Sequence, residues 1–138
     1  MTDSAAIAQA QAWLDELFAP WVRALRLRPE AVSPQGVTLR LPFDESLCRV
    51  GGTVCGQALM SAADTAMVIA IAAQLGEFKP MTTVTLTTHF MRPIAQGDAL
   101  VRARVSKPGR SITFGEIEIV SAADGKLAVQ ASTTYAML

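Results

Sequence analysis

The sequence predicts an α+β fold in which one antiparallel β-sheet wraps around a long central helix, with a further helix at the N-terminus. Residues 56–75 form an apolar run without Pro or internal Gly, long enough for a helix of about 30 Å. After Pro80 the chain changes to four segments rich in Thr and β-branched residues. Short connections separate these segments, so we expect a four-stranded antiparallel meander that buries the helix.

The first 43 residues predict a helix followed by a β-hairpin. Asp3 or Ser4 is available as the N-cap of the helix, and Pro20 is expected to mark its end. Residues 24–28 and 36–43 are candidate strands, joined by the turn Pro34-Gln35-Gly36. The apolar residues of the helix recur at steps of three or four, as on one amphipathic face: Ile7, Ala10, Leu14, Leu17, Phe18 and Trp21.

The central run is apolar nearly all round, which is typical of a helix buried in a core or of one that crosses a membrane. Ser61 and Asp64 interrupt the run, and Gly76 follows its end. A membrane-spanning helix would also leave the downstream strands without a core to cover. We therefore expect a buried central helix and no membrane association.

The four segments after Pro80 lie at residues 82–92, 98–106, 111–120 and 127–137, and each has one face suited to burial. His89, opposite the apolar side chains of the first segment, is expected to be a partly buried structural or interface residue. In the first segment Val84, Leu86 and Phe90 share one face, and Thr83, Thr85, Thr87 and His89 the other. In the second, the faces are Ala99, Val101, Ala103 and Val105 against Leu100, Arg102 and Arg104.

Composition limits the classes of function. The hydrophobic fraction, 51% of 138 residues, suits a single domain over residues 1–138. Twelve basic residues balance twelve acidic ones, so no net field favours nucleic acid or an anionic membrane. Cys48, Cys55 and the lone His89 fit neither a disulfide framework nor a zinc site. We expect a cytoplasmic protein without a metal, and no basic, signal-like segment precedes the first helix.

A candidate site begins where the central helix begins. The glycine-rich segment from Gly51 to Gln57 leads into the helix, whose first backbone N–H groups lack partners within it and can hold a developing negative charge. Asp64 is the single acid of the apolar run. Because an uncompensated buried carboxylate is costly, Asp64 is either a catalytic residue or a core acid capped by Ser or Thr hydroxyls.

Six short motifs follow one another along the chain: Gly52-Thr53-Val54-Cys55-Gly56, Ala62-Ala63-Asp64-Thr65-Ala66, Phe90-Met91-Arg92-Pro93, Gly97-Asp98, Lys107-Pro108-Gly109-Arg110 and Gly125-Lys126-Leu127. In this order and spacing they resemble the hotdog-fold thioesterases, in particular the phenylacetate-degradation (PaaI-like) branch that hydrolyses acyl-coenzyme A thioesters. The resemblance covers nearly the whole chain, from the first helix to Met137. It implies the hotdog fold, which is the sheet-around-helix arrangement expected above.

The resemblance also implies roles for individual residues. The Gly56 amide would be the oxyanion donor, Asp64 the base or nucleophile, and Thr83 the hydroxyl residue at the start of the central strand. Two positions depart from the family pattern, which usually has His-Gly-Gly at Cys55-Gly56-Gln57 and Asn at Arg49. Both departures concern the polarisation of the thioester carbonyl. Gln57, on the first helical turn, is a candidate to orient the carbonyl or the attacking water, or it caps the helix.

Gly56 and Asp64 cannot act on one thioester within a single chain. Eight helical residues separate them by about 12 Å, whereas reacting groups must meet within about 3.5 Å. A two-fold dimer with antiparallel central helices would place Gly56 of one copy beside Asp64 of the other. The resemblance implies the same double-hotdog homodimer with two interfacial sites, with the pairing of dimers into a homotetramer left open.

Cys55 offers a competing chemistry, because a helix N-terminus favours the thiolate form that attacks thioesters. No base lies nearby in the sequence, so we favour Cys55 as a small residue that fills the family's His position and contacts the substrate. Gly52 is either an ordinary turn glycine or a point at which the substrate approaches the backbone closely.

The expected substrate is acyl-coenzyme A, so coenzyme A is part of the substrate and no separate cofactor is expected. Its phosphates require a local cationic rim, for which Arg92, Lys107 and Arg110 are candidates. The turn Gly109-Arg110-Ser111 adds backbone donors. The acyl group is expected to lie against residues of the central helix that would serve equally well as core: Leu59, Met60, Met67 and Val68.

The sequence therefore predicts an acyl-coenzyme A thioesterase for medium-chain or aromatic acyl groups. One alternative is a non-catalytic protein that binds and senses acyl-coenzyme A, which the departures at Arg49 and Cys55 favour. Another is a hotdog dehydratase, although that activity normally needs a His together with an Asp.

Overall fold

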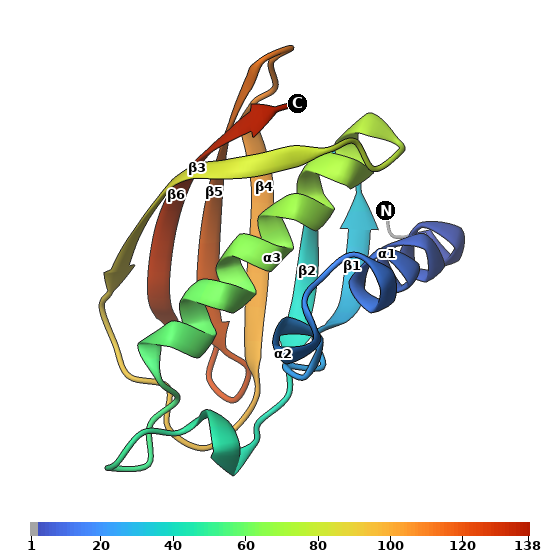
Figure 1. Ribbon diagram of the computed structural model, residues 1–138. Helices are drawn as coiled ribbons and strands as arrows, with labels where there is room; N and C mark the ends of the chain where they lie inside the picture. Colours follow the sequence, from blue (N-terminus) through green and yellow to red (C-terminus); the bar gives the residue numbers. More distant parts are fainter. Residues whose placement is uncertain (1–2) are drawn as a thin grey trace.

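The computed structural model describes residues 3–138 (Figure 1). Met1 and Thr2, part of the segment in which we expect no export signal, lie outside the described residues. The helices are α1 (Ser4–Glu16), α2 (Pro20–Arg23), the 3-10 helix η1 (Glu45–Leu47) and α3 (Gly56–Leu75). The strands are β1 (Arg28–Ser33), β2 (Gly36–Leu41), β3 (Met81–Phe90), β4 (Ala99–Lys107), β5 (Ile112–Ser121) and β6 (Leu127–Met137).

The N-terminal helix is shorter than its apolar pattern predicts. Asp3 caps α1 by accepting a hydrogen bond from the Ala5 backbone N–H at 2.8 Å, as expected, but α1 ends at Glu16. Pro20 begins α2 instead of ending α1, because the first position of a helix needs no N–H donor. Phe18 and Trp21 therefore lie outside α1, in the segment that leads into and through α2.

The candidate strand at residues 24–28 was wrong. Leu25 and Leu27 are both buried, which imitates the alternation of a strand. The backbone nevertheless turns there: the Leu25 N–H donates to the Val22 carbonyl, and Arg26 has a φ of 58°. The first strand, β1, begins only at Arg28. The predicted hairpin is confirmed, since β1 and β2 pair antiparallel with Ser33 opposite Gly36.

The six strands form one antiparallel sheet in the order β1-β2-β4-β5-β6-β3. The expected four-stranded meander was wrong for its first strand, because β3 pairs with β6 and not with β4. The connection after β3 passes below the start of α3, where the Val54 N–H donates to the Ile94 carbonyl at 2.9 Å and Ile94 is buried. It delivers β4 to the side of β2, so β3 is left as an edge strand (Figure 1).

The sheet wraps around α3, as expected for the hotdog fold (Figure 1). Eleven of the twenty residues of α3 are buried, and Gly76 ends the helix in the left-handed region with a φ of 80°. On β5, Gly115 lies so close to Met67 of α3 that a Cβ there would overlap its side chain. Among the described residues α3 is also the single helix long and apolar enough to cross a membrane, and most of it is buried inside the protein.

Strand β3 does not keep the two faces expected of it. A register shift between Thr83 and Thr85 forms a bulge that reverses the alternation. Thr83 and Leu86 are half-buried, whereas Val84 and Phe90 are 56% and 51% exposed. His89 is exposed, contrary to the partly buried position expected. The alternation of β4 is confirmed, because its apolar face is the buried one and its arginines are exposed.

Candidate active site

The middle of α3 carries a carboxylate held by hydroxyl groups from the sheet. Asp64 is half-buried, and its Oδ1 accepts a hydrogen bond from Thr83 Oγ1 at 2.8 Å. Thr83 lies directly before the bulge in β3, and this hydrogen bond shows that its side chain faces α3. The structure therefore places two of the residues singled out in the sequence in direct contact. Such a contact fits both interpretations of Asp64, a catalytic base or nucleophile and a core acid capped by hydroxyls.

A third residue of this cluster, Tyr135 on β6, is one that the sequence reasoning missed. Its hydroxyl lies 2.8 Å from the Asp64 backbone carbonyl and also forms a hydrogen bond with Asp64 Oδ1. Tyr135 is 1% exposed. Burial, followed by the negative charge of Asp64, raises the pKa of Tyr135 well above its ordinary value, so the phenol stays protonated. The missing signal was strand pairing, because Thr83 and Tyr135 lie directly opposite each other in the β3–β6 register.

Asp64 opens into a cavity of about 380 Å³. Gln57, Met60 and Ser61 of α3 line it together with Asp64. Of the expected acyl-pocket residues only Met60 lies here, since Leu59 and Met67 are buried in the core and Val68 does not line the cavity. Apolar side chains from the segment around α2 and from β3 form most of the remaining lining, and the sequence analysis did not assign them to the acyl pocket: Phe18, Trp21, Val22 and Leu86.

The start of α3 is built from backbone. Cys55 is the N-cap and provides no side-chain cap, and the first intrahelical hydrogen bond runs from the Leu59 N–H to the Cys55 carbonyl at 3.3 Å. The amides of Gly56 and Gln57 therefore precede the helical ladder. Gly56 faces the ring of Phe90, which lies 3.3 Å from where a Cβ would be. A side chain at position 56 would therefore press against the Phe90 ring, which is half exposed.

A separate cavity of about 330 Å³ lies at this helix start. Gly56, Arg49 and Arg92 line it, and both arginines are exposed. Cys55 is half-buried and lines neither this cavity nor the one at Asp64. Gly52 is exposed with a φ of 83° and nothing within contact distance of a Cβ. The backbone of the turn is thus sufficient reason for a glycine, and a close approach of the substrate stays a prediction.

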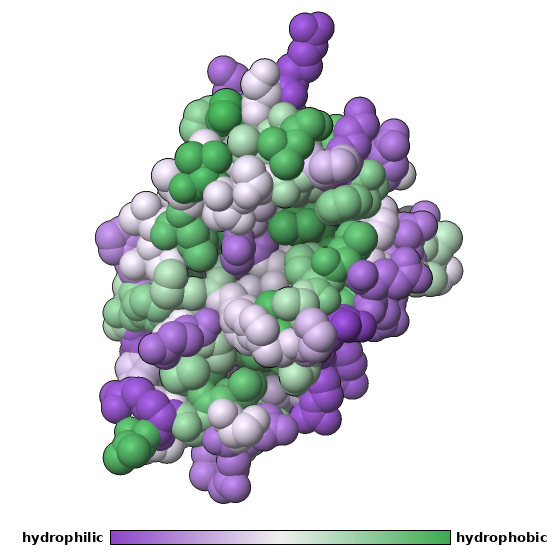
Figure 2. Space-filling model, in the orientation of Figure 1, coloured by the Kyte–Doolittle hydropathy of each residue, from purple (hydrophilic) through white to green (hydrophobic). Residues whose placement is uncertain are grey.

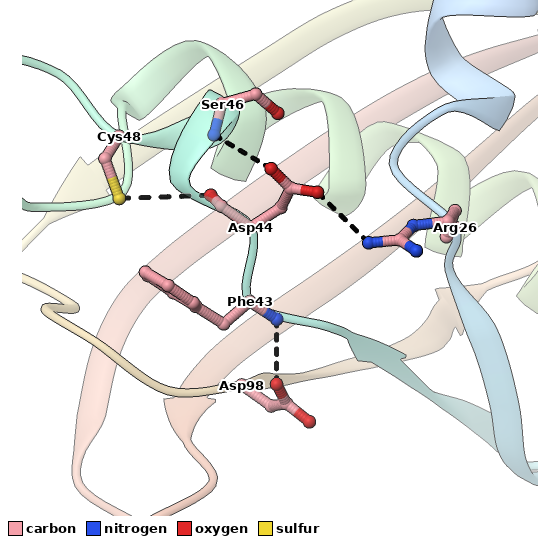
Figure 3. Close-up of polar contacts among 6 residues, drawn as sticks. All are labelled: Arg26, Phe43, Asp44, Ser46, Cys48 and Asp98. Carbon is pink, nitrogen blue, oxygen red and sulfur yellow. Dashed lines mark hydrogen bonds and ion pairs between the residues drawn. The ribbon is translucent and has the colours of Figure 1, made fainter.

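Polar contacts of Asp44 and Asp98 order the loop before α3 (Figure 3). Asp44 caps η1 by accepting from the Ser46 N–H at 2.9 Å, and it pairs with Arg26 at 3.1 Å. Asp98 accepts from the Phe43 N–H at 2.7 Å, and this bond, helped by Arg40, lowers the pKa of Asp98 below its ordinary value. The loop then binds α3 directly, since the Cys55 N–H donates to the Leu47 carbonyl at 2.8 Å.

The basic turn between β4 and β5 lies at the other end of the sheet from the start of α3 (Figure 1). Lys107, Arg110 and Ser111 are exposed there. Gly109 is required by the turn, because a Cβ would overlap the Ile112 carbonyl oxygen. Within one chain, Lys107, Arg110 and Ser111 line neither the cavity at Gly56 nor the one at Asp64.

On the face shown in Figure 2, hydrophobic side chains gather over α3 and β3, and hydrophilic ones lie along the α1 side.

Within residues 3–138 no group of three or more His, Cys, Asp or Glu side chains is placed to hold a metal ion. Cys48 and Cys55 are both free thiols. The charged side chains that line the two cavities along α3 are Asp64 in the first, and Arg49 and Arg92 in the one at the helix start.

Comparison with known proteins finds similarity to thioesterases. Residues 51–128 match the family model described as the thioesterase superfamily. A protein of Thermoplasma acidophilum that carries an esterase name is 25% identical over 124 residues, covering 88% of this chain and 92% of that protein. A thioesterase family protein from Silicibacter pomeroyi has a TM-score of 0.82 at 25% identity, covering 96% of this chain and 98% of that one. The Escherichia coli PaaI protein of the phenylacetic acid degradation operon also has a TM-score of 0.82, at 20% identity, covering 98% and 95%.

Proposed function

The chain belongs to the thioesterase superfamily, and we propose that it hydrolyses the thioester bond of acyl-coenzyme A to a free acid and coenzyme A. One observation carries the proposal: the Asp64 carboxylate, held at Oδ1 by Thr83 and Tyr135, opens into a cavity with apolar walls. A carboxylate beside an apolar cavity suits a reaction in which an acyl group is bound next to the base or nucleophile.

Two chemical routes are available to Asp64. As a base it removes a proton from water, whose oxygen attacks the thioester carbon. As a nucleophile it attacks that carbon itself and forms an anhydride that water then hydrolyses. In both routes the carbonyl oxygen gains negative charge, which the Gly56 amide would stabilise, and the carbon–sulfur bond breaks to release the coenzyme A thiolate, which takes up a proton.

The proposed site needs two copies of the chain. Gly56 and Asp64 line different cavities, consistent with their separation of about 12 Å along α3. Strand β3 is an edge strand with apolar side chains exposed on it, Val84 and Phe90 among them. An edge of this kind favours pairing with another chain. A homodimer in which Gly56 of one copy meets Asp64 of the other would satisfy both observations, and a homotetramer would be a pair of such dimers.

The cavity favours a medium-chain or aromatic acyl group. Phe18, Trp21 and Leu86 offer apolar contact area, and Met60 adds an adaptable side chain. Arg92, beside Gly56, and the exposed Lys107 and Arg110 are the proposed contacts for the coenzyme A phosphates. No cofactor besides the substrate enters this mechanism. The single-domain organisation and the cytoplasmic location stay predictions.

The decisive assay is a panel of medium-chain and aromatic acyl-coenzyme A esters, with release of free thiol measured for the wild type and for Asp64→Ala. We expect turnover of at least one ester by the wild type and none by the variant, with the same circular dichroism spectrum for both. Full activity in Asp64→Ala would overturn the assignment. Binding of the esters without hydrolysis would favour the non-catalytic binding protein, which the unusual Arg49 and Cys55 make the second candidate.

A further inference from the structure

We propose that Tyr135 is a positioning residue for Asp64: with Thr83 it holds Oδ1, so that Oδ2 is the carboxylate oxygen presented to the substrate. The inference rests on the proposed thioesterase function, which gives Asp64 its catalytic role. It goes further by naming a residue on β6 that acts on the reaction through Asp64 without touching the substrate.

The hydrogen bonds at Asp64 are distributed unevenly between its two oxygens. Oδ1 accepts from Thr83 Oγ1 at 2.8 Å and from the Tyr135 hydroxyl. The same Tyr135 hydroxyl lies 2.8 Å from the Asp64 backbone carbonyl, so its single proton is shared between two oxygens of one residue. Within residues 3–138, Oδ2 accepts no hydrogen bond. The two hydroxyls therefore fix the rotation of the carboxylate and leave one oxygen free.

Tyr135 is well placed to act as a rigid anchor. It is 1% exposed, and its strand is paired on both sides, with Thr113 of β5 and Thr83 of β3 opposite it. Its ring is part of the buried hydrophobic core, where close packing leaves little freedom to the phenol. Its pKa is raised by burial and by the nearby Asp64 carboxylate, so the hydroxyl remains a donor across the physiological range of pH.

Orientation of this kind bears directly on the rate. An oxygen that already accepts two hydrogen bonds is a poorer base and nucleophile than one that accepts none. Misplacement of a reacting group by about 1 Å can slow an enzyme by about 100-fold. Removing one of the two hydroxyls should therefore lower kcat while leaving the walls of the acyl cavity, and hence KM, nearly unchanged.

The first test is steady-state kinetics of Tyr135→Phe on the best acyl-coenzyme A ester of the wild type. We expect kcat to fall about tenfold with KM within about twofold, because the ring stays and only the hydroxyl is lost. The matched control is Thr133→Val on the same strand, since the buried Thr133 hydroxyl has no hydrogen-bond partner among the described residues. The control should keep the wild-type kcat. A Tyr135→Phe enzyme that is folded and keeps kcat within twofold would overturn the proposal.

A second test needs no activity and no Tyr135 variant. Tyr135 is the one tyrosine of the chain, so protein labelled with carbon-13 at the phenol carbon gives a single tyrosine signal in nuclear magnetic resonance. We expect that signal to move in Asp64→Ala and to stay unchanged in Asp98→Ala, which removes a distant carboxylate. An unmoved signal in Asp64→Ala would overturn the contact on which the inference rests. Movement of the signal in a protein that hydrolyses no ester would contradict the proposed function instead.

Discussion

The start and the middle of α3 are built in different ways. At the start, backbone amides of Gly56 and Gln57 precede the helical ladder, and the side chains around them, Arg49 and Arg92, are exposed. In the middle, the Asp64 side chain is held by hydroxyls from β3 and β6. A backbone N–H donor remains when a neighbouring side chain is replaced. A carboxylate positioned by hydroxyl groups, in contrast, loses part of its support when either hydroxyl is removed.

This difference bears on the two departures from the family pattern. Cys55 and Arg49 both lie at the start of α3, where the loop fixes the backbone through the bond between the Cys55 N–H and the Leu47 carbonyl at 2.8 Å. The Cys55 side chain makes no cap bond to α3, and the Arg49 side chain donates to the Val50 carbonyl, so neither is bonded to the Gly56 amide. Substitutions at the start of the helix should therefore be tolerated better than those in the middle, unless they cover the amide itself.

The largest effect is expected at the middle of the helix. Asp64→Asn keeps the shape of the side chain but removes the charge that a base or nucleophile needs, so kcat should fall at least about 1,000-fold. Release of free thiol measures the rate, and thermal unfolding should show a folded protein. If the variant keeps a tenth of the wild-type rate, Asp64 is neither the catalytic base nor the nucleophile.

The next largest effect should come from covering the amide at the helix start. A Cβ at position 56 would lie 3.3 Å from the half-exposed Phe90 ring, so the branched side chain of Gly56→Val should displace this ring and cover the amide. We expect kcat to fall about 100-fold, the size of the loss when one oxyanion donor is removed. Gly56→Ala should lose less, and adding Phe90→Leu should restore part of that loss. A wild-type rate in Gly56→Val would show that the Gly56 amide is not the oxyanion donor.

A smaller effect is expected on stability at alkaline pH. Because the pKa of Tyr135 is raised in the folded protein, its contribution to stability is complete below the unfolded value, about pH 10, and is lost as pH rises above it. The wild type should lose up to about 1.4 kcal/mol per pH unit above that point, relative to Tyr135→Phe. Urea unfolding of both proteins between pH 8 and about 11 measures the difference. Parallel curves would mean that the phenol is not buried against Asp64.

The smallest effect is expected for Cys55→Ser. If Cys55 only fills a small space at the N-cap, its replacement should keep kcat within about twofold, since Ser is itself a good N-cap residue. Mass spectrometry of the wild type during turnover should show no acyl group on the chain at Cys55. Loss of turnover in Cys55→Ser, together with an acylated thiol in the wild type, would mean that Cys55 and not Asp64 is the nucleophile.

The sequence predicted those features that depend on neighbouring residues. The bounds of α3 match the prediction, because a glycine at each end and an unbroken apolar run between them are local signals. The pairing of β3 with β6, the bulge at Val84 and the contact between Tyr135 and Asp64 were not predicted. Each of them depends on which distant segments meet. The aromatic wall of the cavity was missed for the same reason, since Phe18 and Trp21 continue the apolar pattern of α1 but lie beyond its end.

The central claim is that Gly56 and Asp64 act together across two copies of the chain. Subunit mixing tests it most directly: Asp64→Asn and Gly56→Val, each of low activity alone, are unfolded together and refolded in equal amounts. In a mixed dimer one site would then hold an intact Gly56 and an intact Asp64, and the other would hold neither. Half of the dimers would be mixed with one good site each, so we expect about one quarter of the wild-type rate to return. Mixed dimers that form but show no recovered activity would contradict the shared site.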